Sequence, residues 1–98
     1  MRILVVQSGG IAGLRSQHEL DTDVLPEETR RSLTQMVAGV AFFGLSPVRA
    51  SKLPDMIHYR VRIEEDGRAH EVTFDDGCGE QPLLELVERV TELARTLR

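Results

Sequence analysis

Apolar and polar positions along the chain predict six elements, beginning with a hairpin. Residues 3–6 form an apolar run that is rich in β-branched side chains, which is typical of a strand. Gly9 and Gly10 follow, and glycines take positive φ without a steric penalty. We therefore expect the chain to reverse there and to return as a second strand over residues 11–20, with Gly13 early in that strand.

Helical periodicity follows the first hairpin. Apolar residues recur there at spacings of three and four, at Leu33, Met36, Val37 and Val40. Candidate N-caps lie just upstream, at Asp21, Thr22 and Asp23. Pro26 suits a first helical turn, so the helix is predicted to begin here, and Gly44 favours its end. Phe42 and Phe43 are then expected to fold back into the core.

The segment from Met56 to Asp75 predicts a second hairpin. Asp66-Gly67 stands between two alternating runs, and a two-residue turn of this kind places Glu65 opposite Arg68 and so fixes the register. The predicted core face carries Tyr59, Val61 and Ile63 opposite Phe74, Val72 and His70. The predicted solvent face carries His58, Arg60 and Arg62 opposite Asp75, Thr73 and Glu71. On that face Arg62 and Glu71 are expected to form a cross-strand ion pair.

A second amphipathic helix closes the chain. Pro82 suits its first turn, and an apolar stripe follows at Leu83, Leu86, Val87, Val90, Leu93, Ala94 and Leu97. The resulting order is β-β-α-β-β-α. We therefore predict an α+β fold in which a four-stranded antiparallel sheet carries two helices on one face, as one domain over residues 1–98.

Composition and charge narrow the function. Lys and Arg number 12 against 16 Asp and Glu, so the net charge of −4 provides no overall attraction for phosphate, and we predict no nucleic-acid partner. No apolar run reaches the roughly 18–20 residues of a membrane-spanning helix, and residues 1–7 lack the pattern of a signal peptide. The lone cysteine, Cys78, cannot form an internal disulfide. A cytoplasmic protein without a membrane partner is expected.

Candidate chemistry is sparse. The glycines around Ser8 fit neither the G-x-G-x-x-G nor the G-x-x-x-x-G-K-S/T pattern of nucleotide-binding loops. His58 and His70 fall on opposite faces of the second hairpin, and His18 has no histidine or cysteine at ligand spacing. Spacing assigns no base to Ser8 or Cys78. We therefore predict no catalytic residue, no metal and no cofactor, and the first hairpin is either purely structural or a loop that contacts a partner.

Several short motifs, taken in order, resemble those of the emfourin family. They are Ser8-Gly9-Gly10-Ile11-Ala12-Gly13, Asp21-Thr22-Asp23 with Leu25-Pro26, Phe42-Phe43-Gly44-Leu45, and Pro54-Asp55 leading into Tyr59-Arg60-Val61 and Asp66-Gly67. Each motif is common, but together they cover nearly the whole chain. The resemblance implies a protein that inhibits protealysin-like metallopeptidases, which are thermolysin-like zinc enzymes, and that is not itself an enzyme.

The first hairpin is the expected contact with such a peptidase. The residues concerned are Ser8, Gly9, Gly10, Ile11, Ala12, Gly13, Leu14 and Arg15. Ile11 or Leu14 would fill the apolar subsite beside the scissile bond that the resemblance implies, with Arg15 at the rim. An alternative contact is the loop over residues 46–55, where Arg49 and Lys52 would face an acidic surface.

A second class of function remains open beside inhibition. It is a non-catalytic interaction module with no peptidase target, in which the first hairpin self-associates through an unpaired strand edge. The chain is accordingly expected to be a monomer or a weak homodimer.

Overall fold

The structure, a computed structural model, describes residues 1–9, 14–47, 57–75, 77 and 81–96. Its elements are β1 (Arg2–Gly9), β2 (Leu14–Asp21), α1 (Glu27–Gly39), β3 (Ile57–Glu65), β4 (Arg68–Asp75) and α2 (Gln81–Thr96). Two short 3-10 helices lie at Thr22–Val24 and Phe42–Gly44. The predicted β-β-α-β-β-α order and the α+β class are confirmed. Leu97, Cys78 and the predicted start of the second strand at Ile11 lie outside the described residues.

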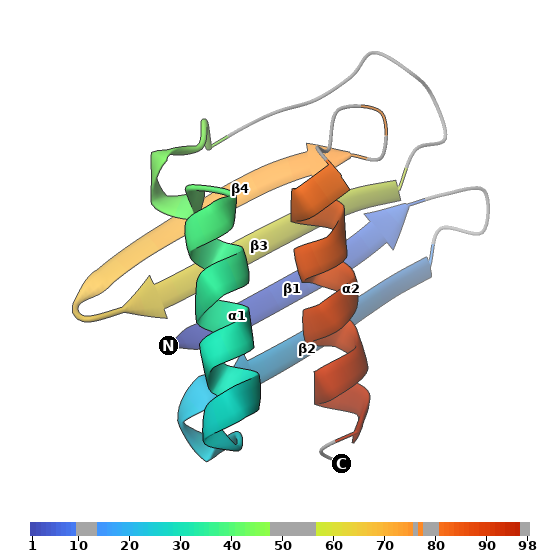
Figure 1. The fold of residues 1–98 in the computed structure, drawn as a ribbon. Coiled ribbons are helices and arrows are strands. Elements are labelled where there is room, and N and C mark those ends of the chain that lie inside the picture. Colours follow the sequence, from blue (N-terminus) through green and yellow to red (C-terminus); the bar gives the residue numbers. More distant parts are fainter. Residues whose placement is uncertain (10–13, 48–56, 76, 78–80, 97–98) are drawn as a thin grey trace.

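All four strands form one antiparallel sheet in the order β2-β1-β3-β4 (Figure 1). The N-terminal strand β1 is therefore central, and it pairs with β2 on one side and with β3 on the other. The register places Gly9 opposite both Leu14 and Ile57. Because neighbouring strands run in opposite directions, the end of β1 meets the starts of β2 and β3 at one end of the sheet.

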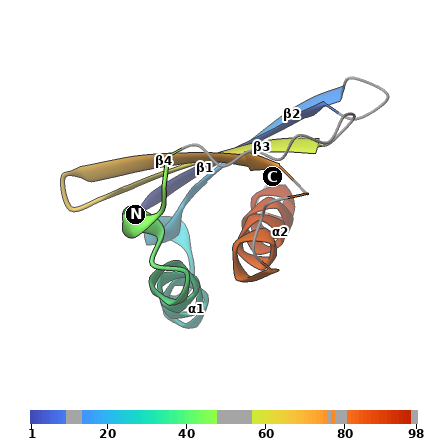
Figure 2. The ribbon, with the colours of Figure 1, turned by 90° about the horizontal axis from the view of Figure 1, so that it is seen from above.

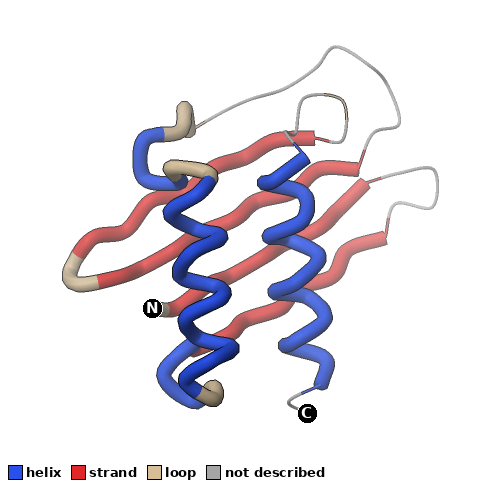
Figure 3. The backbone as a smooth tube through the Cα atoms, in the orientation of Figure 1, coloured by secondary structure: helices blue, strands red, loops and turns tan. Residues whose placement is uncertain are grey.

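Both helices cover the same face of the sheet, as predicted (Figure 2). They lie side by side across the strands in Figure 3. Alternate strand residues point toward them, so Ile3 and Val5 of β1 are buried. The main core consists of Ile3, Val5, Leu20, Leu25, Leu33, Val37, Phe42, Val61, Ile63, Val72, Phe74, Leu83, Leu86, Val87 and Val90. The other face of the sheet carries no helix, and we call it the open face.

The tight turn of the second hairpin is confirmed. Glu65 lies opposite Arg68, and the two residues between them, Asp66 and Gly67, both have positive φ, 49° and 78°. This backbone matches the right-handed twist of the paired strands. The predicted register and core face of this hairpin therefore hold.

The predicted ion pair between Arg62 and Glu71 on the second hairpin does not form, because each residue pairs with another one. Arg62 and Glu71 lie directly opposite each other. However, Glu71 Oε1 lies 3.8 Å from Arg60 Nε, and an Arg62 guanidinium nitrogen lies 3.2 Å from Glu64 Oε1. Long side chains on a sheet also reach diagonal and same-strand neighbours, so register alone does not select the partner.

The predicted N-caps of the first helix are wrong, although the helix does start next to Pro26, as expected. An oxygen of the Asp21 side chain accepts a hydrogen bond from the Asp23 N–H at 3.0 Å, which caps the 3-10 helix rather than α1. Thr22 is buried, and its N–H donates to the Met1 carbonyl at 2.9 Å. α1 begins only after Pro26, because the 3-10 turn first ties the chain to the N-terminus.

Candidate functional site

The residues predicted to contact a partner flank the loop between β1 and β2. Ser8 and Gly9 end β1, whereas Leu14 and Arg15 begin β2. Gly9 has a φ of 98°, in agreement with the expectation that glycine is needed where the chain turns. Gly10, Ile11, Ala12 and Gly13 lie outside the described residues. So do residues 48–55 of the alternative contact loop, which include Arg49 and Lys52.

At this end of the sheet, the register aligns one residue from each of the four strands in a row. Ser8 lies opposite Arg15 on one side and opposite His58 on the other, and His58 lies opposite Asp75. From the sequence, Ser8 was grouped only with the following residues of the first hairpin, as far as Arg15, because the pairing of β1 with β3 has no local signal. The structure thus adds His58 to the predicted site.

A hollow of about 330 Å³ lies on the open face beside this row. It is lined by Val6, Ser8, Arg15, His58, Tyr59, Arg60 and Thr73. We call it the Arg15 hollow. His58 and Arg60 were predicted to lie on a solvent face. The alternation of polar and apolar residues in the second hairpin was the one signal in the sequence that could have indicated their place in a surface site.

Positive charge dominates the Arg15 hollow. Arg15 is exposed and has no ion pair among the described residues, whereas Arg60 is loosely paired with Glu71 at 3.8 Å. The hydroxyls of Ser8 and Thr73 add groups that can donate or accept hydrogen bonds. This combination suits carboxylates on the surface of another protein.

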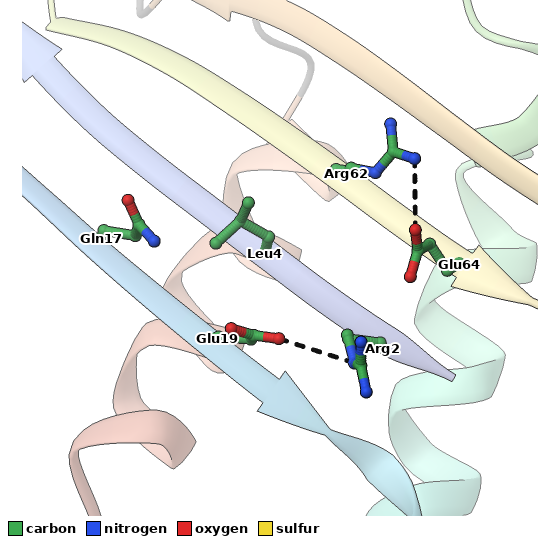
Figure 4. A pocket seen from close by; sticks show the side chains of 6 residues that line it. All are labelled: Arg2, Leu4, Gln17, Glu19, Arg62 and Glu64. Carbon is green, nitrogen blue, oxygen red and sulfur yellow. Dashed lines mark hydrogen bonds and ion pairs between the residues drawn. The ribbon is translucent and has the colours of Figure 1, made fainter.

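A second hollow of about 210 Å³ lies farther along the open face (Figure 4). Its lining residues are Arg2, Leu4, Gln17, Glu19, Arg62 and Glu64. Here the charges are already compensated, because Arg2 Nε lies 3.5 Å from Glu19 Oε1 and Arg62 is paired with Glu64. The second hollow therefore offers less unpaired charge to a partner than the Arg15 hollow does.

Negative charge gathers at the far end of the sheet from the Arg15 hollow. A surface depression there is lined by five acidic residues, Asp21, Asp23, Glu64, Glu65 and Asp66, together with Arg2, Arg68 and the N-terminal Met1. Carboxylates outnumber cations at that end, whereas arginines outnumber carboxylates around the Arg15 hollow, so the sheet has a charge difference along its strands.

Ser8, His58 and Asp75 form a sequence of residue types that also occurs in acyl-transfer enzymes. However, a hydrogen bond of one of these side chains leads away from such an arrangement. Asp75 is 1% exposed, so its predicted place on the solvent face is wrong, and its Oδ1 accepts the Gly77 N–H at 2.9 Å. At least one carboxylate oxygen of Asp75 is thus used by the backbone of Gly77.

The remaining candidate residues contribute no cluster of ligands. His18 is buried on the helix-covered face of β2, and His70 is half-buried beside Phe42. Across the described ranges, no three His, Cys, Asp or Glu residues gather in a way that would hold a metal ion. Neither described α-helix is long and apolar enough to cross a membrane.

Comparison with known proteins identifies the family. Searches of the curated proteins and of the solved structures found no match. The sequence model of one family, described as Emfourin, matches residues 5–91, which extend from β1 into α2. The chain therefore belongs to the emfourin family.

Proposed function

We propose that this protein inhibits a thermolysin- or protealysin-like zinc metallopeptidase by docking the β1–β2 end of its sheet in the active-site cleft. Membership of the emfourin family is the observation that carries the proposal, since the family suggests a metallopeptidase-inhibitor role. The partner is a protein, and the inhibitor performs no chemistry of its own.

The position of β1 in the sheet supports the first hairpin as the contact. β1 is hydrogen-bonded on both sides, so Gly9 and Leu14 are held as the last pair of a ladder within a four-stranded sheet. Residues 10–13 are thus attached at both ends to the body of the protein. If the enzyme cut this segment, both new chain ends would therefore remain attached to the inhibitor through the sheet.

The Arg15 hollow supports an electrostatic role beside the hairpin. Arg15 is the second residue of β2 after the loop, and it lines the same hollow as His58 and Arg60. In the proposed complex these residues face carboxylates at the rim of the peptidase cleft. Charges at a rim act mainly on the rate of association.

Titration of a thermolysin-like peptidase with the purified protein tests the proposal. We expect activity to fall linearly to zero at a fixed molar ratio. Arg15→Glu should weaken inhibition by about tenfold, chiefly through slower association, with a strong dependence on salt. Arg30→Glu makes the same change of charge on an exposed position of α1 and serves as the matched control.

A second variant tests the apolar contact. Ile11→Asp puts a charge where the peptidase subsite requires an apolar side chain, and inhibition should fall by more than about tenfold. If both Arg15→Glu and Ile11→Asp fold normally and inhibit as well as the parent protein, the hairpin is not the contact. If the parent protein leaves a panel of such peptidases fully active, inhibition itself is wrong.

A further inference from the structure

The two edges of the sheet differ in how they are covered. On the β4 edge, the Thr73 N–H donates a hydrogen bond to the Pro47 carbonyl at 2.8 Å, so the segment after the Phe42–Gly44 helix covers part of that strand. β2 is the outermost strand on the other side of the sheet (Figure 1), and no backbone hydrogen bond from any described residue reaches it from outside the sheet. Among the residues that the structure describes, β2 is therefore left uncovered along its outer edge, where another strand could pair with it.

Charge along β2 is arranged so that the strand complements itself. Arg15, Gln17 and Glu19 are exposed and alternate along the open face. If the direction of the strand is reversed, Arg15 and Glu19 exchange places and Gln17 stays in the middle. Two copies of β2 in antiparallel alignment about Gln17 would thus place each Arg15 opposite Glu19 of the partner subunit.

Matching of faces limits the possible registers. If the two β2 strands paired symmetrically about a point between Gln17 and His18, Arg15 would lie opposite Leu20 of the partner subunit. Leu20 is 2% exposed and points toward the helices. A centre on His18 would put Arg15 opposite Asp21, whose carboxylate already caps the 3-10 helix. Centring on Gln17 avoids both conflicts.

Glu19 is well placed to accept a second cation. It is exposed at the edge of the sheet, and its contact with Arg2 is a single approach at 3.5 Å (Figure 4). A carboxylate has two oxygens and accepts several hydrogen bonds, so Glu19 can bind Arg2 and an arginine of a second copy together.

We infer that the β2 edge binds a second copy of this chain, which gives a weak antiparallel homodimer with one continuous sheet. Both pairs of helices would then lie on the same side of that sheet. The inference is independent of inhibition, and it is tested in the absence of any peptidase.

Complementary charge reversal provides the test. In sedimentation measurements over a range of concentrations, the parent protein should show a monomer–dimer equilibrium. Arg15→Glu and Glu19→Arg should each weaken dimerisation by about tenfold or more, because each places two pairs of like charges in contact. An equimolar mixture of the two variants should restore the dimer, since every pair in the mixed species is again opposite in charge.

Two controls make the result specific. Arg30→Glu and Glu85→Arg carry the same charge changes on exposed helix positions and should dimerise as the parent does. Circular dichroism checks that each variant is folded. A monomeric parent at all concentrations, or a mixture that stays monomeric, would overturn the inference. Restoration by Asp21→Arg in place of Glu19→Arg would overturn the Gln17-centred pairing.

Discussion

His70 illustrates how a single side chain joins separate segments of this fold. Its Nε2 lies 2.8 Å from the Leu45 carbonyl oxygen, and its ring meets Phe42 edge-on with centroids 5.6 Å apart. A carbonyl oxygen only accepts hydrogen bonds, so Nε2 carries the proton and donates it. His70 thereby fastens the turn after α1 to β4.

Replacing His70 tests this role. His70→Ala removes the hydrogen bond and the packing against Phe42, and we expect the free energy of unfolding to fall by about 1–3 kcal/mol. His58→Ala, at an exposed position of the neighbouring strand, should change stability by less than about 0.5 kcal/mol. Urea unfolding followed by circular dichroism measures both, and equal effects of the two variants would contradict the assignment.

At the scale of elements, two glycines with similar surroundings are expected to respond to the same substitution in opposite ways. A Cβ added at Gly39, the last residue of α1, or at Gly67, in the β3–β4 turn, would meet no atom within 4 Å. Of these two glycines, only Gly67 has a positive φ, 78°. The difference between the two sites is thus one of backbone conformation and not of space.

Alanine substitutions at these two positions separate the effect of backbone strain from that of helix propensity. Gly67→Ala should destabilise the protein by about 1 kcal/mol, because an L-residue is strained at positive φ. Gly39→Ala should stabilise it by up to about 1 kcal/mol, since alanine has the higher helix propensity and restricts the unfolded chain. Thermal unfolding of both variants measures the shifts, and a change in the same direction for both would refute the argument.

Elements defined by local signals were predictable, whereas their long-range partners were not. Asp66-Gly67 and the alternation around it fixed the register of β3 and β4 from adjacent residues. The pairing of β1 with β3 joins positions such as Ser8 and His58, far apart in the chain, and no pattern in either strand specifies it. The sheet order β2-β1-β3-β4 therefore emerged only from the structure.

The same limit explains what was missed in the candidate site. Ser8 and Arg15 were predicted together because they flank one short loop. Arg60 and Thr73 join them only through the β1–β3 and β3–β4 pairings. The choice of Glu71 as the partner of Arg60 depends on side-chain conformation, which sequence does not encode at an exposed position.

At the scale of the whole molecule, the proposed single domain predicts one cooperative unfolding transition. Tyr59 is the only tyrosine and there is no tryptophan, so tyrosine fluorescence reports on β3, where Tyr59 stacks on Phe74 at 5.2 Å. Far-UV circular dichroism reports mainly on the helices. We expect the two signals to give the same midpoint in urea. Separate midpoints would show that sheet and helices unfold independently.

Arg15 belongs both to the hollow beside the first hairpin and to the free edge of β2. Arg15 would face the peptidase in one proposed complex and Glu19 of the partner subunit in the other, so we expect the two complexes to compete. In a concentrated solution, much of the protein would then be dimeric and unable to inhibit, and dilution would release active monomers. The apparent inhibitory potency would therefore depend on the concentration at which the protein is stored.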